Sequence, residues 1–226
     1  HHKPKEERKT GFVVITGAKG LAGAYNHNVL KLAESYLARK QDSTLFLIGQ
    51  MGRHYFEKKN IPIDAEFMYT AQDPTLDRAQ DICGTLVDLY ERGALDEIYL
   101  VFTHSYSAMR MEPEIIKLLP LDRAMLSARR GLSEADQYRD VERYEPSPEA
   151  VLGGLGPGVI RGYIFAALVE SFCSEQSSRM SAMDSASESA RDMLKTLSLE
   201  FNRARQGAIT QEITEIAGGA EALNQQ

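Results

Sequence analysis

The sequence predicts an α/β domain with a parallel-rich sheet, followed by a long C-terminal coiled-coil helix. Short β-rich runs alternate with helix-like stretches through the first half of the chain. No proline follows Pro157, and the apolar residues beyond it recur at spacings of three and four. We therefore expect a flexible lead-in over 1–11, a Rossmann-like α/β domain over 12–146 and a helical stalk segment over 147–226.

The α/β prediction starts from the order of the first elements. Residues 12–16 form a continuous apolar, β-rich run, and a glycine-rich turn over 17–23 leads into a helix expected over 25–39. A second strand is expected over 45–48, and a short helix over 52–58.

The alternation continues beyond this point. We expect a third strand over 65–68, a helix over 75–92, a strand over 97–102 and a shorter one over 115–119. Because strands and helices alternate in this way in sheets covered by helices, the predicted arrangement is a parallel-rich sandwich.

The stretch between the domain and the long helix is charged and then rich in glycine. We interpret 121–144 as a loop or mobile excursion. Ser147 and Pro148 have the form of a helix N-cap and first helical residue. The short helix that follows is expected to stop in the glycines of 153–158, either as a soft joint or as a plain helix break.

The last third of the chain, 159–223, is predicted to be one uninterrupted helix, with Gly218 and Gly219 as a natural stop. About 60 residues at 1.5 Å each give a length of roughly 90 Å. Its apolar seam consists of Met180, Met183, Ala186, Ala190, Met193, Leu197, Phe201, Ala204, Ala208, Ile209, Ile213 and Ile216. A lone helix cannot bury such a seam, so we expect it to need a partner.

Composition argues against several classes of function. The 26 basic and 32 acidic residues give a net charge of −6 without a basic cluster, which argues against nucleic acid as a partner. Cys83 and Cys173 form no CxxC motif, which fits a reducing compartment. No apolar run is long enough to span a bilayer, so any membrane link is expected to come through partners.

The glycine turn raises the alternative of an NAD(P)-binding oxidoreductase of the short-chain dehydrogenase type. The turn follows a strand and opens a helix, and Tyr36 and Lys40 form a YxxxK pattern. The glycines lie at 17, 20 and 23, however, and Gln50 stands where an acidic ribose ligand is needed. We expect a structural turn that binds no nucleotide cofactor.

Other chemical signatures are weak. The five histidines lack metal-ligand spacing, and no GxSxG or Cys/His signature is present. The sequence therefore predicts no catalytic, cofactor-binding or metal-binding residue.

Two segments of the long helix carry a family resemblance. SEQSSRMSAMD at 174–184 and LSLEFNRARQGAITQEITEI at 197–216 resemble the C-terminal helix of the γ subunit of F-type ATP synthase. The family also has a turn similar to 20–26. Its usual Ser-Asp-Arg is replaced here by Gly-Ala-Lys at 17–19, so no role of that Asp is carried over.

The resemblance implies a non-catalytic rotor subunit. In the family the C-terminal helix, wound against an N-terminal one, runs up the axis of an α3β3 hexamer, and its rotation couples ion flow through the c-ring to ATP synthesis or hydrolysis. The segment resembling 8–11 lies well inside the family's subunit, after that N-terminal helix. We therefore expect a fragment, a truncated form or a departure from the family.

The resemblance also implies contact residues, for which a solvated helix face is the simpler alternative. Positions that match contacts with the β-subunit catch loops are Arg205, Gln206, Thr210 and Glu212. Positions that match the apolar bearing at the top of the hexamer are Ile213, Ile216 and Leu223. Positions that match the stalk foot, near ε and the c-ring, are Tyr144 and Glu145.

The implied partners are the α and β subunits, ε and the c-ring. Membrane association is expected only through that complex, at the cytoplasmic face of the bacterial inner membrane or its equivalent. The isolated chain is expected either to self-associate through its C-terminal helix or to fray beyond about Asn202, because a single helix lacks tertiary support. A free-standing adaptor with a γ-like fold is a further alternative, which a pull-down with α and β subunits would distinguish.

Overall fold

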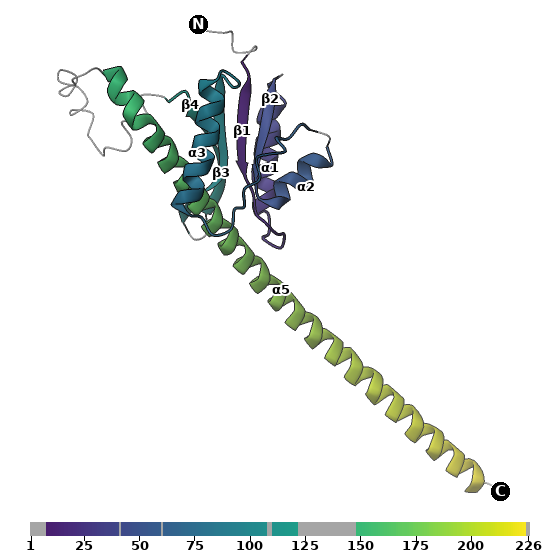
Figure 1. Cartoon of the computed structure of the whole chain (residues 1–226). Helices are drawn as coiled ribbons and strands as arrows, with labels where there is room; N and C mark the ends of the chain where they lie inside the picture. The colour runs from purple at the N-terminus through teal and green to yellow at the C-terminus, as the bar shows by residue number, and fades with distance from the viewer. Residues whose placement is uncertain (1–7, 41, 60, 108–109, 122–147, 225–226) are drawn as a thin grey trace. The chain divides into compact units, whose positions relative to one another are not determined.

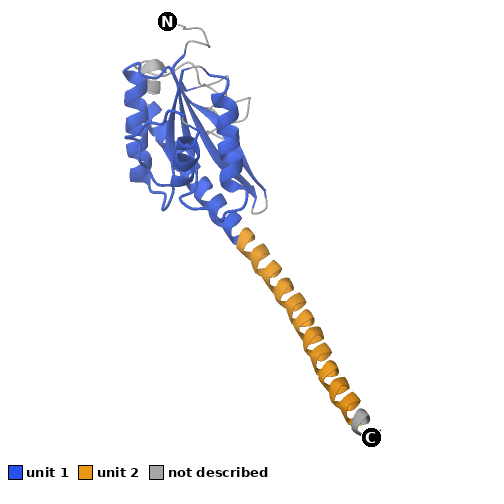
Figure 2. Cartoon of the chain, turned by 90° about the vertical axis from the view of Figure 1, so that its right-hand side faces the viewer, with its two compact units in different colours: residues 1–180 blue, residues 181–226 orange. Residues whose placement is uncertain are grey.

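The computed structural model describes residues 8–40, 42–59, 61–107, 110–121 and 148–224. The chain divides into two compact units, residues 1–180 and 181–226 (Figure 2). Most of the predicted lead-in and the predicted loop over 121–144 lie outside the described residues. Within the described part of the chain, no helix has both the length and the apolar character needed to cross a bilayer.

A four-stranded sheet in the order β2-β1-β3-β4 forms the centre of the first unit (Figure 1). The strands are β1 (Thr10–Ile15), β2 (Ser43–Ile48), β3 (Glu97–Ser107) and β4 (Arg110–Leu119). β1 pairs in parallel with β2 and β3, whereas β4 runs antiparallel to β3. The predicted parallel-rich α/β sheet is therefore confirmed, and the short strand expected over 115–119 is the second half of the longer β4.

In the described part of the chain before residue 122, three helices accompany the sheet: α1 (Tyr25–Leu37), α2 (Gln50–Glu57) and α3 (Leu76–Glu91). Each of them overlaps a predicted helix. The N-cap of α3 is Thr75, whose hydroxyl accepts a hydrogen bond from the backbone N–H of Arg78. Gly93 follows its C-terminus with a φ of 71°, a conformation that favours glycine.

The strand expected over 65–68 is wrong. The described structure has only two isolated β-bridges here, and both lie outside 65–68. They join Ile63 to Leu45 and Tyr69 to Ile48 of β2. The Asp64 carboxylate accepts hydrogen bonds from the backbone N–H groups of Glu66 and Phe67, at 3.0 and 2.9 Å. Because this local turn satisfies those N–H groups, no ladder forms there.

Side chains of β1 alternate between two hydrophobic cores. Val13 and Ile15 point into a core shared with α3, and Phe12 and Val14 into one shared with α1 and α2. The first core also takes in four residues of the C-terminal helix: Ile160, Ile164, Ala167 and Leu168. The sheet is thus covered on both faces, as expected for strands with continuous apolar sequence.

The C-terminal helix α5 runs from Pro148 to Asn224 and includes Pro157. The uninterrupted helix predicted over 159–223 is confirmed, whereas the break predicted over 153–158 is wrong. Tertiary packing explains this, because Ile160 and the buried residues after it hold the helix against the sheet and outweigh the low helix propensity of the preceding glycines. The stop at Gly218 is also wrong, since a glycine pair weakens a helix without requiring its end.

Candidate functional site

The described part of the second unit, 181–224, is a single helical segment, and its large apolar side chains up to residue 220 are exposed. Exposed large hydrophobic side chains in it are Met183, Met193, Leu194, Leu197, Leu199, Phe201, Ile209, Ile213 and Ile216. Phe201 is 67% exposed and Ile216 is 74% exposed. Since large apolar side chains in a row are usually covered, this surface is the strongest candidate for a partner contact.

The predicted contact residues lie on this helix. Arg205, Gln206, Thr210 and Glu212 are exposed, as are Ile213 and Ile216. Leu223 is part of the helix, although its side chain is outside the described set. Tyr144 and Glu145, the predicted stalk foot, lie outside the described residues.

These four polar residues fall into two pairs around the helix axis. At about 100° per residue, Arg205 and Glu212 lie within about 20° of each other, and Gln206 and Thr210 within about 40°. The two pairs are separated by about 130°. One flat surface therefore cannot contact all four residues at once.

Within the first unit, α5 changes from an apolar to a polar contact along its length. Ile160, Ile164 and Leu168 are buried in the core, and Ser171, Ser174 and Glu175 follow as buried polar residues. The Ser171 hydroxyl accepts a hydrogen bond from the backbone N–H of Thr103 at 3.3 Å. On the neighbouring face of α5, Glu170 pairs with His104 of β3.

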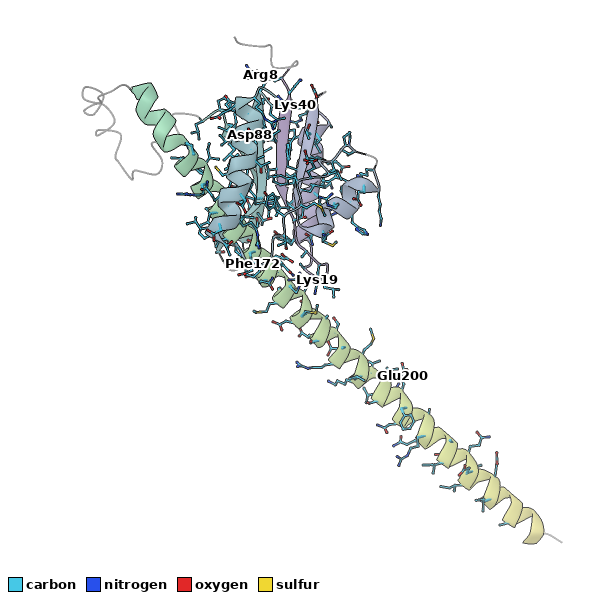
Figure 3. The ribbon with its side chains drawn as sticks, in the orientation of Figure 1. Arg8, Lys19, Lys40, Asp88, Phe172 and Glu200 are labelled. Atoms are coloured by element: carbon cyan, nitrogen blue, oxygen red, sulfur yellow. The ribbon has the colours of Figure 1, made fainter. Side chains whose placement is uncertain are left out.

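The glycine turn contacts this polar part of α5. Arg179 Nη2 donates to Glu175 Oε1 at 2.6 Å and to the carbonyl oxygens of Lys19 and Gly20 at 3.4 Å. Figure 3 places Lys19 beside the stretch of α5 that carries Phe172. The carbonyl oxygens of the turn therefore face the Arg179 guanidinium, which is a cation. In a phosphate-binding loop, backbone N–H groups face an anion instead.

Asn26 and Glu175 occupy the space beside Gly17 where a bound phosphate group would lie. The backbone N–H of Gly17 donates to Asn26 Oδ1 at 2.8 Å, and a Cβ on Gly17 would lie 2.8 Å from Glu175 Oε1. This is the carboxyl edge of β1 and β3, where open α/β sheets usually bind ligands because the strand order reverses there. Here the chain's own helix occupies that edge.

Sequence reasoning missed the role of Glu175 and Arg179. Both residues stand in the segment 174–184 that carries the resemblance, and their i, i+4 spacing is that of a helical ion pair. The same spacing also occurs in ion pairs on a solvated helix face, so the spacing alone does not reveal burial. The Glu175 side chain is in fact only 2% exposed, so the pair is part of an internal contact.

A second buried carboxylate lies at the opposite end of the sheet, where Figure 3 shows Arg8 and Lys40. The Glu97 side chain is 3% exposed and forms ion pairs with Arg8 at 3.6 Å, with Lys117 at 3.2 Å and with Lys40. Burial alone raises the pKa of Glu97, but hydrogen bonds and charge from Lys40 and Lys117 outweigh it and lower the pKa to about 2. This cluster joins β3 and β4 to the chain segments before β1 and after α1.

The described residues contain no side-chain cluster suited to metal binding. Among them, no group of three or more His, Cys, Asp or Glu side chains could hold a metal ion. Cys83 is buried and Cys173 exposed, and both are free thiols. A cavity beside Gly49 and Arg53 has a volume of about 200 Å³, smaller than typical cofactor pockets of roughly 300–1,000 Å³.

Comparison with known proteins identifies similar chains along nearly the whole length. A family model described as ATP synthase matches residues 1–223. The ATP synthase gamma chain of Acetivibrio thermocellus is 46% identical over 221 residues, which cover 97% of this chain and 75% of that protein. The sodium ion specific ATP synthase gamma chain of Acetobacterium woodii is 36% identical over 231 residues, covering 97% and 76%.

Solved structures share the fold. A chain from the mitochondrial ATP synthase of Euglena gracilis, in a structure that contains OSCP, F1 and the c-ring, aligns with a TM-score of 0.70 at 17% identity. The alignment covers 96% of this chain and 74% of that one. An α/β body with a long C-terminal helix is thus an arrangement that this chain has in common with it.

Proposed function

Because the chain belongs to the ATP synthase γ family, we propose how its C-terminal helix engages the rest of that complex. The chain is a central-stalk subunit of the rotary ATP synthase, a membrane-bound complex, and it is not a catalytic subunit of it. Its relatives give no support to the alternatives of an NAD(P)-dependent oxidoreductase or a free-standing adaptor. Within the complex, the exposed helix and the α/β body would contact different subunits.

The proposed partners of the exposed helix are the α and β subunits. The exposed apolar residues of unit 181–226 support this, because an isolated helix gains nothing from such a surface and a surrounding hexamer covers it. The α/β body is proposed to contact ε and the c-ring, with Tyr144 and Glu145 at the foot. In a bacterial cell this puts the chain at the cytoplasmic face of the inner membrane.

The two polar pairs are proposed to contact different β subunits. A rod on the axis of a three-fold ring meets different subunits on different faces, and the angle of about 130° between the pairs is close to the 120° between neighbouring β subunits. Arg205 and Glu212 would contact one catch loop, and Gln206 and Thr210 another. Rotation of the rod would then exchange which β subunit each pair touches, and this asymmetry couples rotation to the catalytic sites.

The apolar bearing is proposed to consist of Ile213, Ile216 and Leu223. At 100° per residue, Ile216 and Leu223 lie within about 20° of each other on the helix. Ile213 and Ile216 are 61% and 74% exposed, so they are available to an apolar collar at the top of the hexamer. Contacts without directional hydrogen bonds suit a bearing, because they resist rotation little.

Coupling in the assembled enzyme tests the proposal. Replacing Arg205 and Gln206 with Ala together would remove one charge-assisted and one neutral hydrogen bond, worth about 2–4 kcal/mol of contact free energy. We expect lower ATP-driven ion pumping or weaker assembly in reconstituted vesicles. The fold of the chain should stay the same, because both side chains are exposed.

A matched control uses the same residue types on the same helix. The Arg203→Ala, Gln211→Ala double variant changes one Arg and one Gln at positions that the family resemblance does not match to β-subunit contacts. It should pump and assemble normally. Equal behaviour of the two double variants would contradict the proposed β contacts.

A further inference from the structure

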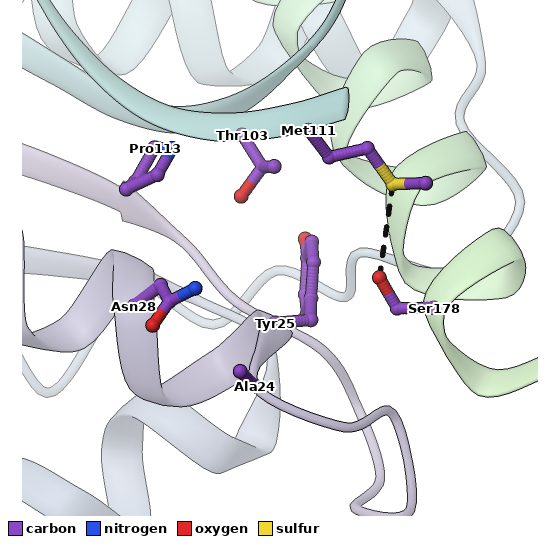
Figure 4. A pocket seen from close by; sticks show the side chains of 7 residues that line it. All are labelled: Ala24, Tyr25, Asn28, Thr103, Met111, Pro113 and Ser178. Atoms are coloured by element: carbon purple, nitrogen blue, oxygen red, sulfur yellow. Dashed lines mark hydrogen bonds between the residues drawn. The ribbon is translucent and has the colours of Figure 1, made fainter. Parts of the chain in front are cut away.

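A cavity of about 100 Å³ lies inside the first unit, between α1, β3, β4 and α5 (Figure 4). Tyr25 of α1 and Thr103 of β3 line it, and in Figure 4 their hydroxyl groups point toward the same open space. Tyr25 is 5% exposed and Thr103 is 4% exposed. Neither hydroxyl has a hydrogen-bond partner among the described residues.

About one turn before Ser178, the α5 residue that lines the cavity, α5 carries two further buried polar atoms. Ser174 is 1% exposed and Glu175 is 2% exposed. Within the described part of the chain, Ser174 Oγ and Glu175 Oε2 also lack a hydrogen-bond partner. Burial raises the pKa of Tyr25, and the charge of Glu175 raises it further, so the phenol and this carboxylate act on each other electrostatically.

The side chains around the cavity do not satisfy these atoms themselves. The Ser171 and Thr103 hydroxyls lie near the Tyr25 phenol, yet among the described residues no group meets the geometry of a hydrogen bond to that phenol. At the rim, Ser178 directs its hydroxyl to Met111 Sδ at 3.7 Å. Buried hydroxyls and carboxylates without partners are costly, so another group is needed to pair with them.

The charged side chains near the cavity limit which kind of ligand can pair with the buried hydroxyls. Arg179 already neutralises Glu175 through Oε1, which disfavours an added cation. An anion would meet the Glu175 carboxylate, and an apolar molecule would leave the hydroxyls unpaired. A small neutral group that both donates and accepts hydrogen bonds fits, and water has this chemistry.

We propose that this cavity is a hydration site in which ordered water molecules bridge the Tyr25 and Thr103 hydroxyls to each other and to the polar part of α5, whose Ser178 lines the cavity. One water needs roughly 10–15 Å³ of such volume, so the cavity has room for several. The helix α5 is then held by two different contacts. One is a dry apolar contact at 160–168, and the other is a wet polar contact at 171–178.

A crystal structure of the full chain, at a resolution that shows single waters, tests the proposal directly. We expect at least one water within hydrogen-bonding distance of both Tyr25 Oη and Thr103 Oγ1. The same water should disappear in the Thr103→Val variant, which keeps the side-chain shape, and remain in Thr103→Ser, which keeps the hydroxyl. A direct hydrogen bond between Tyr25 and Thr103 across a collapsed cavity, or a bound ion or organic molecule there, would overturn it.

Water relaxation in solution provides an independent readout. Oxygen-17 magnetic relaxation dispersion counts waters with long residence times, and we expect the Tyr25→Phe, Thr103→Val double variant to lose at least one of them. Tyr106→Phe removes a phenol from a side chain that is 51% exposed, and should lose none. An unchanged count in a folded double variant would refute the hydration site.

Discussion

The ion-pair cluster around Glu97 leads to a prediction about stability and pH. Glu97→Gln keeps the shape of the side chain but removes the charge that Lys40, Lys117 and Arg8 face. Lowering a carboxyl pKa from 4.5 to about 2 corresponds to about 3 kcal/mol, at 1.36 kcal/mol per pKa unit. The cationic partners are partly exposed, with side chains 22–34% accessible, so we expect a loss of about 1–3 kcal/mol at pH 7.

The sign of the pH dependence is set by the direction of the pKa shift. Because folding lowers the pKa of Glu97, its contribution to stability is complete above the unfolded-state value near 4.5 and is lost as the pH falls toward 2. The native protein should therefore lose stability over this range. Glu97→Gln should lose less, so the difference in unfolding free energy between the two proteins should shrink.

Urea denaturation followed by near-UV circular dichroism measures this difference, because tyrosine signals report on the α/β body and far-UV signals are dominated by the long helix. The measurement is repeated from pH 7 down to about pH 3. Glu57→Gln, an exposed carboxyl of α2, serves as the matched control and should change stability little. A difference between Glu97→Gln and the native protein that stays constant across the pH range would refute the reasoning.

Three further predictions concern nucleotides, self-association and the turn after β2. Isothermal titration with NADH, NADPH and ATP should show no binding, since α5 occupies the carboxyl edge of the sheet; a micromolar dissociation constant for any of them would contradict this. The isolated chain should either self-associate through the exposed helix, because burying apolar surface is worth about 25 cal/mol per Å², or fray beyond about Asn202, because a single helix lacks tertiary support. Met193→Glu with Leu197→Lys should shift it to monomer in sedimentation while the α/β body stays folded, and a native protein that is monomeric at high concentration, with slow hydrogen exchange along the whole helix, would count against the idea. Gly49→Ala should destabilise the body by several kcal/mol, since Gly49 has a φ of 91° and a Cβ there would lie 2.1 Å from the Thr16 carbonyl oxygen; thermal unfolding close to that of the native protein would show that the turn can relax.

The local sequence predicted an element correctly where its apolar pattern follows from the element's own geometry and burial. The strands predicted over 45–48 and 97–102 are confirmed as parts of β2 and β3, and the strand predicted over 12–16 overlaps β1 except for its last residue. These runs are β-rich and apolar because both faces of the sheet are covered, so the pattern does not depend on knowing the neighbours. The same holds for the long helix, whose apolar spacing is a property of the helix itself.

Local sequence failed where distant packing or a local turn competed with propensity. The glycines and proline of 153–158 predicted a break, yet the helix continues because the residues after them are anchored in the core. The strand-like segment 65–68 predicted a strand, but Asp64 closes a turn and Phe67 packs into the core instead. In both cases the deciding contacts were not visible in the segment.

The α/β alternation, the long helix and the family resemblance could be predicted from the chain alone, because they depend on periodicity and on residues that are close along the chain. The role of the glycine turn could not, because it depends on a contact with a distant part of the chain. Arg179 and Lys19 are 160 residues apart in the sequence, and the Arg179 guanidinium donates a hydrogen bond to the Lys19 carbonyl oxygen. Through this contact, a loop that resembles a nucleotide-binding turn packs against α5 instead. Hydrogen bonds and charges act over a few ångströms in space, so their partners become known only once the chain has folded.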